Sequence, residues 1–568
     1  MDFSRLLNAA VLLLAPRATT AVPSVPPPIS ANAVSLQLQL NDAAKISIPS
    51  TLTIAPGVYV FSNTSATVTG ATDLNIDAHG VTFVFYYGFG LDITNCHNVS
   101  VRGLTLDSDP PNYAQGVLTK LESVTSANGS TTSVATAIFD DAFLTPNTSF
   151  LCTKSGQRGS KIMFWDPATR LPLKATLNFM DGQPEQGGSA WRIHLQLPVT
   201  AAAKQAPLGS LVTLFGRRGI TFQTTNSSQV LAEDVTIHAG GNMGFHENYG
   251  GGGHIYRRVR IVRKPGSTGL MALNADGFHS YSLSQGPTLE DSEISFTGDD
   301  FLNLWSGAYA VCAPGGGGPP DSNSLIIADS HSADASFGRT SLLSTLRRND
   351  VLQFYKLLSG RNGGHTESAP LLGSMSVTVA KEVTDKGLLR QCRQLDKAMA
   401  LPPYNASFVN PGMFAGAAVY NVTFSASLHS AFTAAADYNL ALVSFPRMSS
   451  SGAVVRRNHF HDAAGSGGRL LLQTPRLALA DNVFERFGGL YIWAGEQIYM
   501  GGTLGLHNIS LRNTTFVDGG MMVCAGLRNV TCKDTTFVNS QGHATHTADG
   551  CSSAISGINS EDNNKLYD

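Results

Sequence analysis

Short stretches in which apolar and polar residues alternate recur along the chain, and their clearest copies lie near the C-terminus. Each of four copies places a Phe two or three residues after an Asn or Asp. Alternation predicts strands, and its recurrence predicts a solenoid whose coils stack on one another. The Phe residues are 24, 32 and 21 positions apart: Phe460, Phe484, Phe516 and Phe537. We expect an inward Phe ladder beside bends of Asn or Asp, which tolerate a left-handed backbone.

The same register fits the middle of the chain. Residues 235–237, 259–261 and 293–295 align as equivalent strands, and three pairs then stack: Phe245-His246, Phe278-His279 and Leu302-Asn303. This alignment places Asp276 beside Asp300. The earlier stretches 52–60, 74–80 and 98–107 resemble opening coils of the same rod. Unrelated β-hairpins with a chance similarity are the alternative interpretation.

Two long segments interrupt the repeat and contain strand-like stretches without its spacing. We interpret both as inserted β modules or elaborate loops. The expected division is a signal peptide at 1–21, N-terminal β-helix coils at 33–111, an inserted β-rich module at 112–215, central coils with the candidate site at 216–312, a second insertion at 313–440, C-terminal coils at 441–540 and a tail at 541–568.

The N-terminus and the glycosylation motifs indicate export. A short basic start precedes an apolar stretch at 6–15 that is too short to span a membrane, as in a signal peptide; a buried N-terminal helix is the alternative. Ten Asn-X-Ser/Thr motifs follow, at Asn63, Asn98, Asn128, Asn147, Asn226, Asn405, Asn421, Asn508, Asn513 and Asn529. We therefore expect an extracellular, N-glycosylated protein.

Composition and charge narrow the possible partners. Charged residues make up 14% of the chain and Gly numbers 57, which suits short strands and tight turns rather than disorder. The formal charge of −2 gives no reason to expect nucleic acid, and no second apolar segment is long enough to suggest a membrane. The seven Cys leave at least one unpaired within the chain. CxxC and HExxH motifs do not occur, so we expect no metal and no cofactor.

The candidate chemistry lies in two aspartate motifs. Asp276 precedes Asp299 and Asp300 by 23 and 24 residues, about one coil, and neighbouring strands lie about 4.8 Å apart. Three carboxylates brought together raise the pKa of at least one of them. Glycosidic-bond hydrolysis needs one protonated acid and one ionised base, so we expect these aspartates to be catalytic. Turn formation and Ca²⁺ binding are the alternatives.

Further residues are candidates for contacting a sugar. His246, His279 and Asn303 would lie on one face and could hydrogen-bond to hydroxyls, although single His residues are more often structural. The other substrate-binding candidates are Glu247 beside this row, Trp305 and Trp493 as apolar platforms or partly core residues, and Arg469 and Glu496 from later coils.

With these motifs, the chain resembles the family-110 glycoside hydrolases, which are secreted exo-acting α-galactosidases. The similarity rests on residues 106–116, the ADG and GDD motifs, 467–474 and 490–496, and it covers most of 35–540. It implies an all-β fold, a right-handed single-stranded parallel β-helix with inserted β modules. It also implies an aspartate triad at Asp276, Asp299 and Asp300, and cleavage of terminal α-1,3-linked galactose with inversion. Residues 493–496 match the corresponding motif loosely.

We expect Asp299 to act as the acid, with Asp276 and Asp300 holding the water. The partner is then a glycan or polysaccharide. Pectin-degrading family-28 hydrolases share the fold, but their Gly-His-Gly and Arg-Ile-Lys motifs do not follow Asp300 here. A basic cleft for uronic acids would have to come from Arg257, Arg258, Arg260, Arg263 and Lys264. A polysaccharide lyase and a non-catalytic glycan-binding rod are the remaining alternatives.

Overall fold

The structure is a computed structural model of the 568-residue chain. It describes residues 30–86, 89–125, 131–140, 142–143, 161–184, 190–195, 206–215, 219–305, 309–314, 323–329, 342–355, 371–395, 417–428, 442–464, 468–472, 474–493, 507–519, 521–525 and 528–538. The expected signal peptide, the C-terminal tail and Glu496 lie outside these residues.

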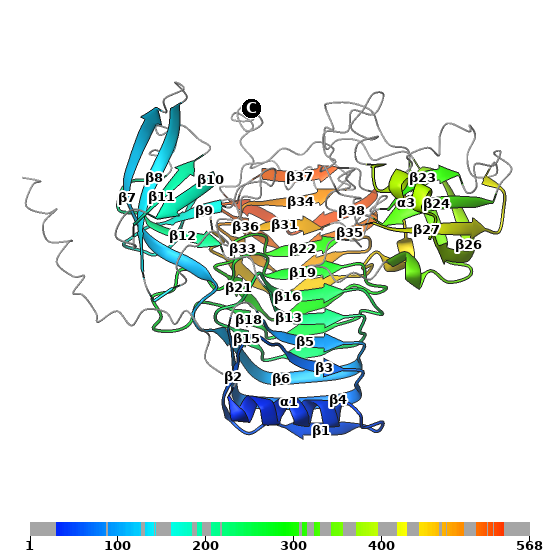
Figure 1. Ribbon diagram of the computed structural model, residues 1–568, viewed down its shortest axis with the longest axis horizontal. Coiled ribbons are helices and arrows are strands. Elements are labelled where there is room, and N and C mark those ends of the chain that lie inside the picture. Colours follow the sequence, from blue (N-terminus) through cyan, green and yellow to red (C-terminus); the bar gives the residue numbers. More distant parts are fainter. Residues whose placement is uncertain are drawn as a thin grey trace, which may run out of the picture. The chain divides into compact units, whose positions relative to one another are not determined.

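Three ladders of parallel strands stack along the chain (Figure 1). The first ladder consists of β3 (Ala66–Thr69), β5 (Leu91–Thr94), β13 (Ile220–Thr225), β16 (Met243–Asn248), β19 (Phe278–Tyr281), β22 (Leu302–Trp305), β31 (Arg469–Leu472), β34 (Gly489–Trp493) and β37 (Met521–Ala525). Because each strand pairs in parallel with the equivalent strand of the next coil, this part of the chain is a parallel β-helix, as predicted.

The other two ladders share the long strands β4 (Thr72–Phe85) and β6 (His97–Ser108). The second ladder adds β1 (Ser50–Thr53), β14 (Leu231–Glu233), β17 (Ile255–Arg257), β20 (Thr288–Glu290), β29 (Val454–Arg456), β32 (Ala478–Ala480), β35 (His507–Arg512) and β38 (Arg528–Lys533). The third adds β2 (Gly57–Phe61), β15 (Thr236–Ile237), β18 (Arg260–Ile261), β21 (Glu293–Ser295), β30 (His459–His461), β33 (Val483–Glu485), β36 (Thr515–Val517) and β39 (Thr536–Val538). Helix α1 (Ala31–Ala43) lies beside the first coils (Figure 1). The right-handed sense is the one that nearly all parallel crossovers adopt.

Inward-facing aromatic rings form the core of the coils. In the third ladder Phe460, Phe484 and Phe516 are paired in register, and their rings stack with centroids 4.6 and 5.1 Å apart. The left-handed bend comes three residues before each Phe, for example at Arg457 and Asp481, which have φ of 56° and 57°. The expected bend is therefore confirmed at Asn513 and Asp534, which have φ of 43° and 52°, and wrong by one residue at Asn458 and Asn482.

Those two asparagines are instead buried in the interior. The side-chain oxygen of Asn482 accepts hydrogen bonds from the backbone N–H and the side-chain amide of Asn458, at 3.1 and 3.0 Å. Each side chain thus satisfies polar groups of the neighbouring coil. A buried amide is stable only when it is paired in this way.

The residues at these bends alternate in charge from coil to coil. We name Asp234, Arg258, Asp291, Arg457 and Asp481 the bend ladder; all have positive φ. Arg258 donates two hydrogen bonds to Asp234 at 2.7 and 2.8 Å, and Arg457 donates two to Asp291 at 2.6 and 2.8 Å. These contacts lower the pKa of both aspartates. Because the pairs are partly exposed, each contributes little to stability alone.

A second alternating row precedes the bend ladder by one residue. It runs through Glu233, Arg257, Glu290 and Arg456 in the second ladder. Arg257 reaches both acidic neighbours, at 3.4 Å to Glu233 and 2.7 Å to Glu290. Arg456 donates to Glu290 from the other side, at 2.7 Å. Each arginine in these rows therefore links neighbouring coils.

The two interruptions of the β-helix fold as closed antiparallel barrels. The first barrel contains β7 (Tyr113–Thr125), β8 (Thr131–Phe139), β9 (Lys161–Trp165), β10 (Pro172–Pro184), β11 (Ala190–Leu195) and β12 (Leu211–Phe215). The second contains β23 (Tyr309–Pro314), β24 (Ser324–Asp329), β25 (Val351–Tyr355), β26 (Leu371–Glu382), β27 (Ala418–Phe424) and β28 (Leu442–Ser444), with α3 (Lys386–Cys392) and the 3₁₀ turns η5 (Leu342–Thr345) and η7 (Pro446–Met448) nearby in the chain. A disulfide joins Cys312 to Cys392. None of the described helices is long and apolar enough to cross a membrane.

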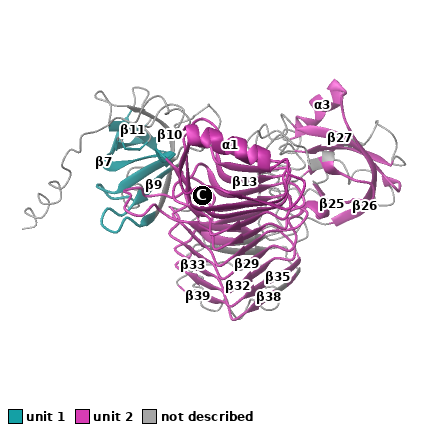
Figure 2. Cartoon of the chain, turned by 90° about the horizontal axis from the view of Figure 1, so that it is seen from below, with its two compact units in different colours: residues 1–28, 109–216 teal, residues 29–108, 217–568 magenta. Residues whose placement is uncertain are grey.

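The chain divides into two compact units (Figure 2). One unit holds the first barrel, at residues 109–216, together with residues 1–28. The other comprises residues 29–108 and 217–568, and so contains the three ladders and the second barrel. All candidate site residues belong to this larger unit.

Glu247 faces the interior of the coil. Along β16 its side chain lies on the same face as Phe245, whose ring contacts Tyr256 at 5.2 Å between centroids. Glu247 is fully buried, and burial raises the pKa of its carboxyl to about 8, although hydrogen bonding to Ser280 and Tyr256 opposes the shift. The carboxyl is therefore neutral at pH 7.

We predict that Glu247 makes the protein less stable as the pH rises. The folded-state pKa is raised from 4.5 to about 8, so the stabilising proton is fully present below pH 4.5 and is lost as pH rises through 8. Each unit of pKa difference corresponds to about 1.4 kcal/mol. Urea unfolding at pH 5 and pH 9 measures the fall in the free energy of unfolding between the two pH values. This fall should be smaller in Glu247→Gln than in wild type, and the variant should be the more stable protein at pH 9.

Glu290→Gln is the matched control, because arginine partners lower the pKa of this buried carboxyl. It should destabilise the protein at pH 9. A Glu247→Gln variant with an unchanged pH dependence would contradict a neutral interior carboxyl.

Candidate active site

The three aspartates converge where two consecutive coils enter the first ladder. Asp276 precedes β19, and Asp299 and Asp300 precede β22. The backbone N–H of Gly277 donates to the carbonyl of Asp300 at 2.8 Å, and that of Asp299 donates to Ala275 at 3.3 Å. One oxygen of each carboxylate lies within 4.8 Å of the others. The one-coil spacing in the sequence therefore corresponds to direct proximity.

Gly277 permits this close approach of the two coils. A Cβ atom at this position would lie 3.0 Å from the carbonyl oxygen of Phe301 and 2.6 Å from a methyl carbon of Ile294. Any larger residue would push the two segments apart. The residue after Asp276 must therefore be a glycine for steric reasons, in addition to the preference of Asp-Gly pairs for turns.

Arg469 brings a cation to the paired aspartates. It begins β31 in the next coil, where the N–H of Gly468 donates to the Asp299 carbonyl at 2.8 Å. The guanidinium Nε donates to Oδ1 of Asp300 at 2.8 Å, and Nη2 lies 3.4 Å from Oδ1 of Asp299. The side chain is 33% exposed. Arg469, expected to contact substrate, thus lies at the carboxylates themselves.

Asp300 is the aspartate best placed to hold a proton. Its side chain is only 3% exposed, and this burial raises its pKa well above the usual value. The guanidinium of Arg469 opposes the shift, whereas the negative charges of Asp299 and Asp276 add to it. This arrangement favours Asp300 as the acid, rather than Asp299 as expected from the sequence.

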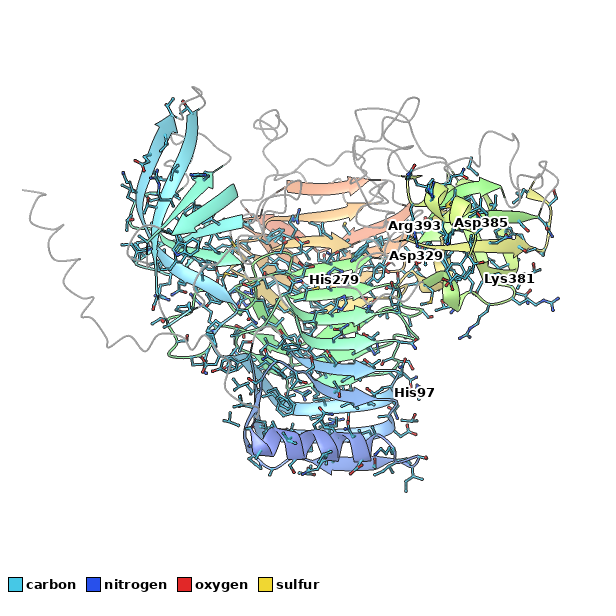
Figure 3. All side chains as sticks on the ribbon, in the orientation of Figure 1. His97, His279, Asp329, Lys381, Asp385 and Arg393 are labelled. Atoms are coloured by element: carbon cyan, nitrogen blue, oxygen red, sulfur yellow. A yellow bond between two sulfur atoms is a disulfide. The ribbon has the colours of Figure 1, made fainter. Side chains whose placement is uncertain are left out.

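Asp276 is held as a hydrogen-bond acceptor. Its Oδ2 accepts from Nδ1 of His279 at 2.8 Å and from the side-chain amide of Asn303 at 3.2 Å. The indole Nε1 of Trp305 donates to Nε2 on the other side of the His279 ring. Figure 3 shows His279 on the stacked strands of the first ladder. Two donors on one oxygen favour an ionised carboxylate, as a general base requires.

The remaining sequence-predicted residues lie in three settings. His246 packs against His279 with ring centroids 5.3 Å apart, and burial lowers its pKa. Glu247 faces the interior, because successive strand residues point to opposite faces, so a direct sugar contact is not supported. Trp493 lies in β34, which pairs with β31. The side chain of Trp493 and all of Glu496 lie outside the described part of the structure.

Trp305 is not an exposed platform. It is 4% exposed and belongs to a hydrophobic cluster with Tyr281 and residues of the second barrel. The sequence did not reveal this role, because the partners of the ring are far away in the chain. Strand alternation alone could have shown that Trp305 and Asn303 point to the same side as His279.

A positively charged side chain lies beside the carboxylate cluster. Three oxygens at this spacing also resemble a cation site. However, the Arg469 guanidinium contacts both Asp299 and Asp300 and neutralises part of their charge. The described residues therefore suit acid–base chemistry without an ion.

Comparisons with known proteins find similar folds at low scores. No protein-family model matches the chain, and no curated protein matches it. Among solved structures, an endo-xylogalacturonan hydrolase from Aspergillus tubingensis has a TM-score of 0.32 and 8% identity over 93% of this chain and 96% of that one. A family 28 exopolygalacturonase from Yersinia enterocolitica has a TM-score of 0.31 and 8% identity over 93% of this chain and 66% of that one. The tailspike protein gp49 from Pseudomonas phage LKA1 has a TM-score of 0.18 and 9% identity over 89% of this chain and 52% of that one. Similarity at this level gives no information about function, so the function is inferred from the geometry of the site.

We predict that the stabilities of Arg469 and Asp300 variants are coupled. Arg469→Gln removes the side chain that donates to Asp300 and the positive charge beside Asp299. It should cost about 1–3 kcal/mol at pH 7, less than the loss of a fully buried pair, because the guanidinium is partly exposed. Adding Asp300→Asn should recover part of this loss in a double-mutant cycle measured by urea unfolding.

Arg486→Gln provides the control, since Arg486 pairs with the buried Asp462. It should show a similar cost that Asp300→Asn does not recover. Strict additivity of Arg469→Gln and Asp300→Asn would contradict a direct interaction between the two side chains.

Proposed function

We propose that this protein is a secreted glycoside hydrolase that removes terminal α-linked galactose from a glycan. One observation carries the proposal: three carboxylates from two consecutive coils each place an oxygen within 4.8 Å of the others, and burial raises the pKa of one while another accepts two hydrogen bonds. Paired carboxyl groups in opposite protonation states are the machinery of glycosidic-bond hydrolysis.

In the proposed mechanism Asp300 donates its proton to the glycosidic oxygen. The bond from the anomeric carbon to this oxygen breaks, and the leaving alcohol departs neutral. Asp276 takes a proton from a water molecule whose oxygen attacks the anomeric carbon. Proton transfer of this kind contributes about 10²–10⁴-fold to a rate. Asp299 and Arg469 flank the acid and set the charge around it.

This single displacement would invert the anomeric carbon. Inverting enzymes usually separate the two carboxyl groups by about 6.5–9.5 Å, to leave room for water. Here one oxygen of each carboxylate lies within 4.8 Å of the others, which is closer than that separation. Inversion therefore rests on the family resemblance, and the anomer of the product tests it directly.

The positions of the basic residues support a neutral sugar. Arg257, Arg258 and Arg260 pair with acidic residues of the second and third ladders and their bends. Arg263 lies over the ring of Phe296 at 3.6 Å, and Lys264 pairs with Asp107 at 2.6 Å. Among the described residues, Arg469 is the cation paired with the aspartate triad, and two carboxylates already engage it. A uronic acid would need a further positive charge.

Two further features support secretion. A disulfide between Cys312 and Cys392 suits an oxidising compartment. Six asparagines of the glycosylation motifs are exposed among the described residues: Asn63, Asn98, Asn226, Asn508, Asn513 and Asn529.

Hydrolysis of a disaccharide with a terminal α-1,3-linked galactose tests the proposal. Wild type should release β-galactose first, as followed by NMR. Asp300→Asn, which keeps the shape but cannot donate the same proton, should lower kcat by at least about 10²-fold. Asp291→Asn, in the bend ladder, is the control and should retain activity.

Other outcomes separate the alternatives. Release of α-galactose first would contradict single displacement. No galactose release, together with cleavage of polygalacturonate, would replace the proposal with a pectin-degrading activity. Cleavage that is equally fast in Asp300→Asn would show that the triad is not the catalytic site.

A further inference from the structure

The second barrel begins directly after the coil that carries two of the three aspartates. Trp305 ends β22, and β23 of the barrel starts at Tyr309. The Trp305 ring lies 4.7 Å from that of Tyr281 and belongs to one buried cluster with barrel residues such as Tyr309, Leu343 and Phe354. Trp305 is therefore shared between the barrel core and the β-helix.

The indole of Trp305 defines the tautomer of His279. An indole N–H can only donate a hydrogen bond, so Nε2 of His279 must accept it and carry no proton. The proton of the neutral imidazole is then on Nδ1, which donates to Asp276 at 2.8 Å. The reverse tautomer would place two donors against each other at Nε2 and leave Nδ1 as an acceptor facing a carboxylate.

We propose that the second barrel positions Asp276 through Trp305 and His279. The packed indole fixes one imidazole tautomer, and this tautomer holds the carboxylate that activates water. The inference rests on the proposed function, in which Asp276 is the base. His279 and Trp305 are then positioning residues, and the barrel holds the catalytic coil in its active geometry.

The surroundings of His279 keep the ring neutral. It is 3% exposed, and burial lowers its pKa to about 3 although the charge of Asp299 opposes the shift. Within its own coil, His279 contacts Asp276. The buried ring of His246 in β16 packs against one side of His279, and the indole of Trp305 in β22 contacts it from the next coil. Asn303, also in β22, donates to Asp276. A ring that stays neutral across ordinary pH can hold a single tautomer.

Trp305→Phe tests the proposal, because it keeps an aromatic ring in the cluster and removes only the donor and part of the ring volume. In protein labelled with ¹⁵N-histidine, the His279 signals are assigned by their loss in His279→Gln. Wild type should show only the Nδ1–H tautomer between pH 5 and 8. Trp305→Phe should show a mixture of tautomers and a kcat lowered about 10–100-fold, with KM changed less than threefold.

Two further variants separate positioning from general packing. Tyr281→Phe removes a hydroxyl from the ring that packs against Trp305 and keeps the indole donor, so the His279 tautomer should not change. Phe354→Leu loosens the barrel core away from the site, so a fraction of the second tautomer should appear. Unfolding midpoints of all variants show whether each remains folded under the conditions of the spectra.

Several results would overturn the proposal. An Nε2–H or doubly protonated His279 in wild type at pH 7 would exclude the indole contact. A Trp305→Phe spectrum identical to wild type would show that the indole does not set the tautomer. Failure of wild type to hydrolyse any glycan would refute the proposed function alone, because the tautomer is measured without substrate. A normal kcat in Trp305→Phe despite mixed tautomers would remove the positioning role.

Discussion

The register of the backbone hydrogen bonds between successive coils is the constraint on which the rest of the structure depends. It sets His279 opposite Asn303 and brings Asp276 against Asp300. A slip of one residue in any coil would turn each side chain of that strand to the opposite face. The same register stacks Phe484 on Phe516 in the core, so the packing that stabilises the rod also holds the candidate site.

Much of this register could be predicted from the sequence. The repeated Phe spacing and the aligned Phe245 and Phe278 gave both the parallel β-helix and the proximity of the aspartates, because both follow from local alternation. Alternation also implies that Glu247 points inward with Phe245, an implication that the sequence interpretation did not draw. A partly core position was one of the interpretations of Trp305, but the partners that bury it were not predictable, since they belong to a barrel whose strands come from distant segments. The bends at Asn513 and Asp534 were predicted correctly, whereas those at Arg457 and Asp481 were placed one residue late. Arginine is an unusual left-handed residue, and the aspartate partner of Arg457 lies 166 positions away.

Charge is distributed unevenly over the described part of the rod. Arginines of the second ladder and the bend ladder are engaged with acidic residues of neighbouring coils, whereas at the first ladder one guanidinium serves a cluster of carboxylates. Burial raises the pKa of Asp300 above that of an isolated aspartate, and the negative charges of Asp299 and Asp276 add to this shift. Structural and chemical uses of charge are thus kept on different faces of each coil.

The alternation of charge in the bend ladder limits how this solenoid can change in length. Losing the single coil that carries Arg258 would set Asp234 against Asp291, and the preceding row would set Glu233 against Glu290 at the same time. Like charges directly opposite each other on adjacent strands are destabilising. Removing two neighbouring coils in this region would keep opposite charges together, whereas removing one would not, so stability favours changes of length in steps of two coils although the structural repeat is one.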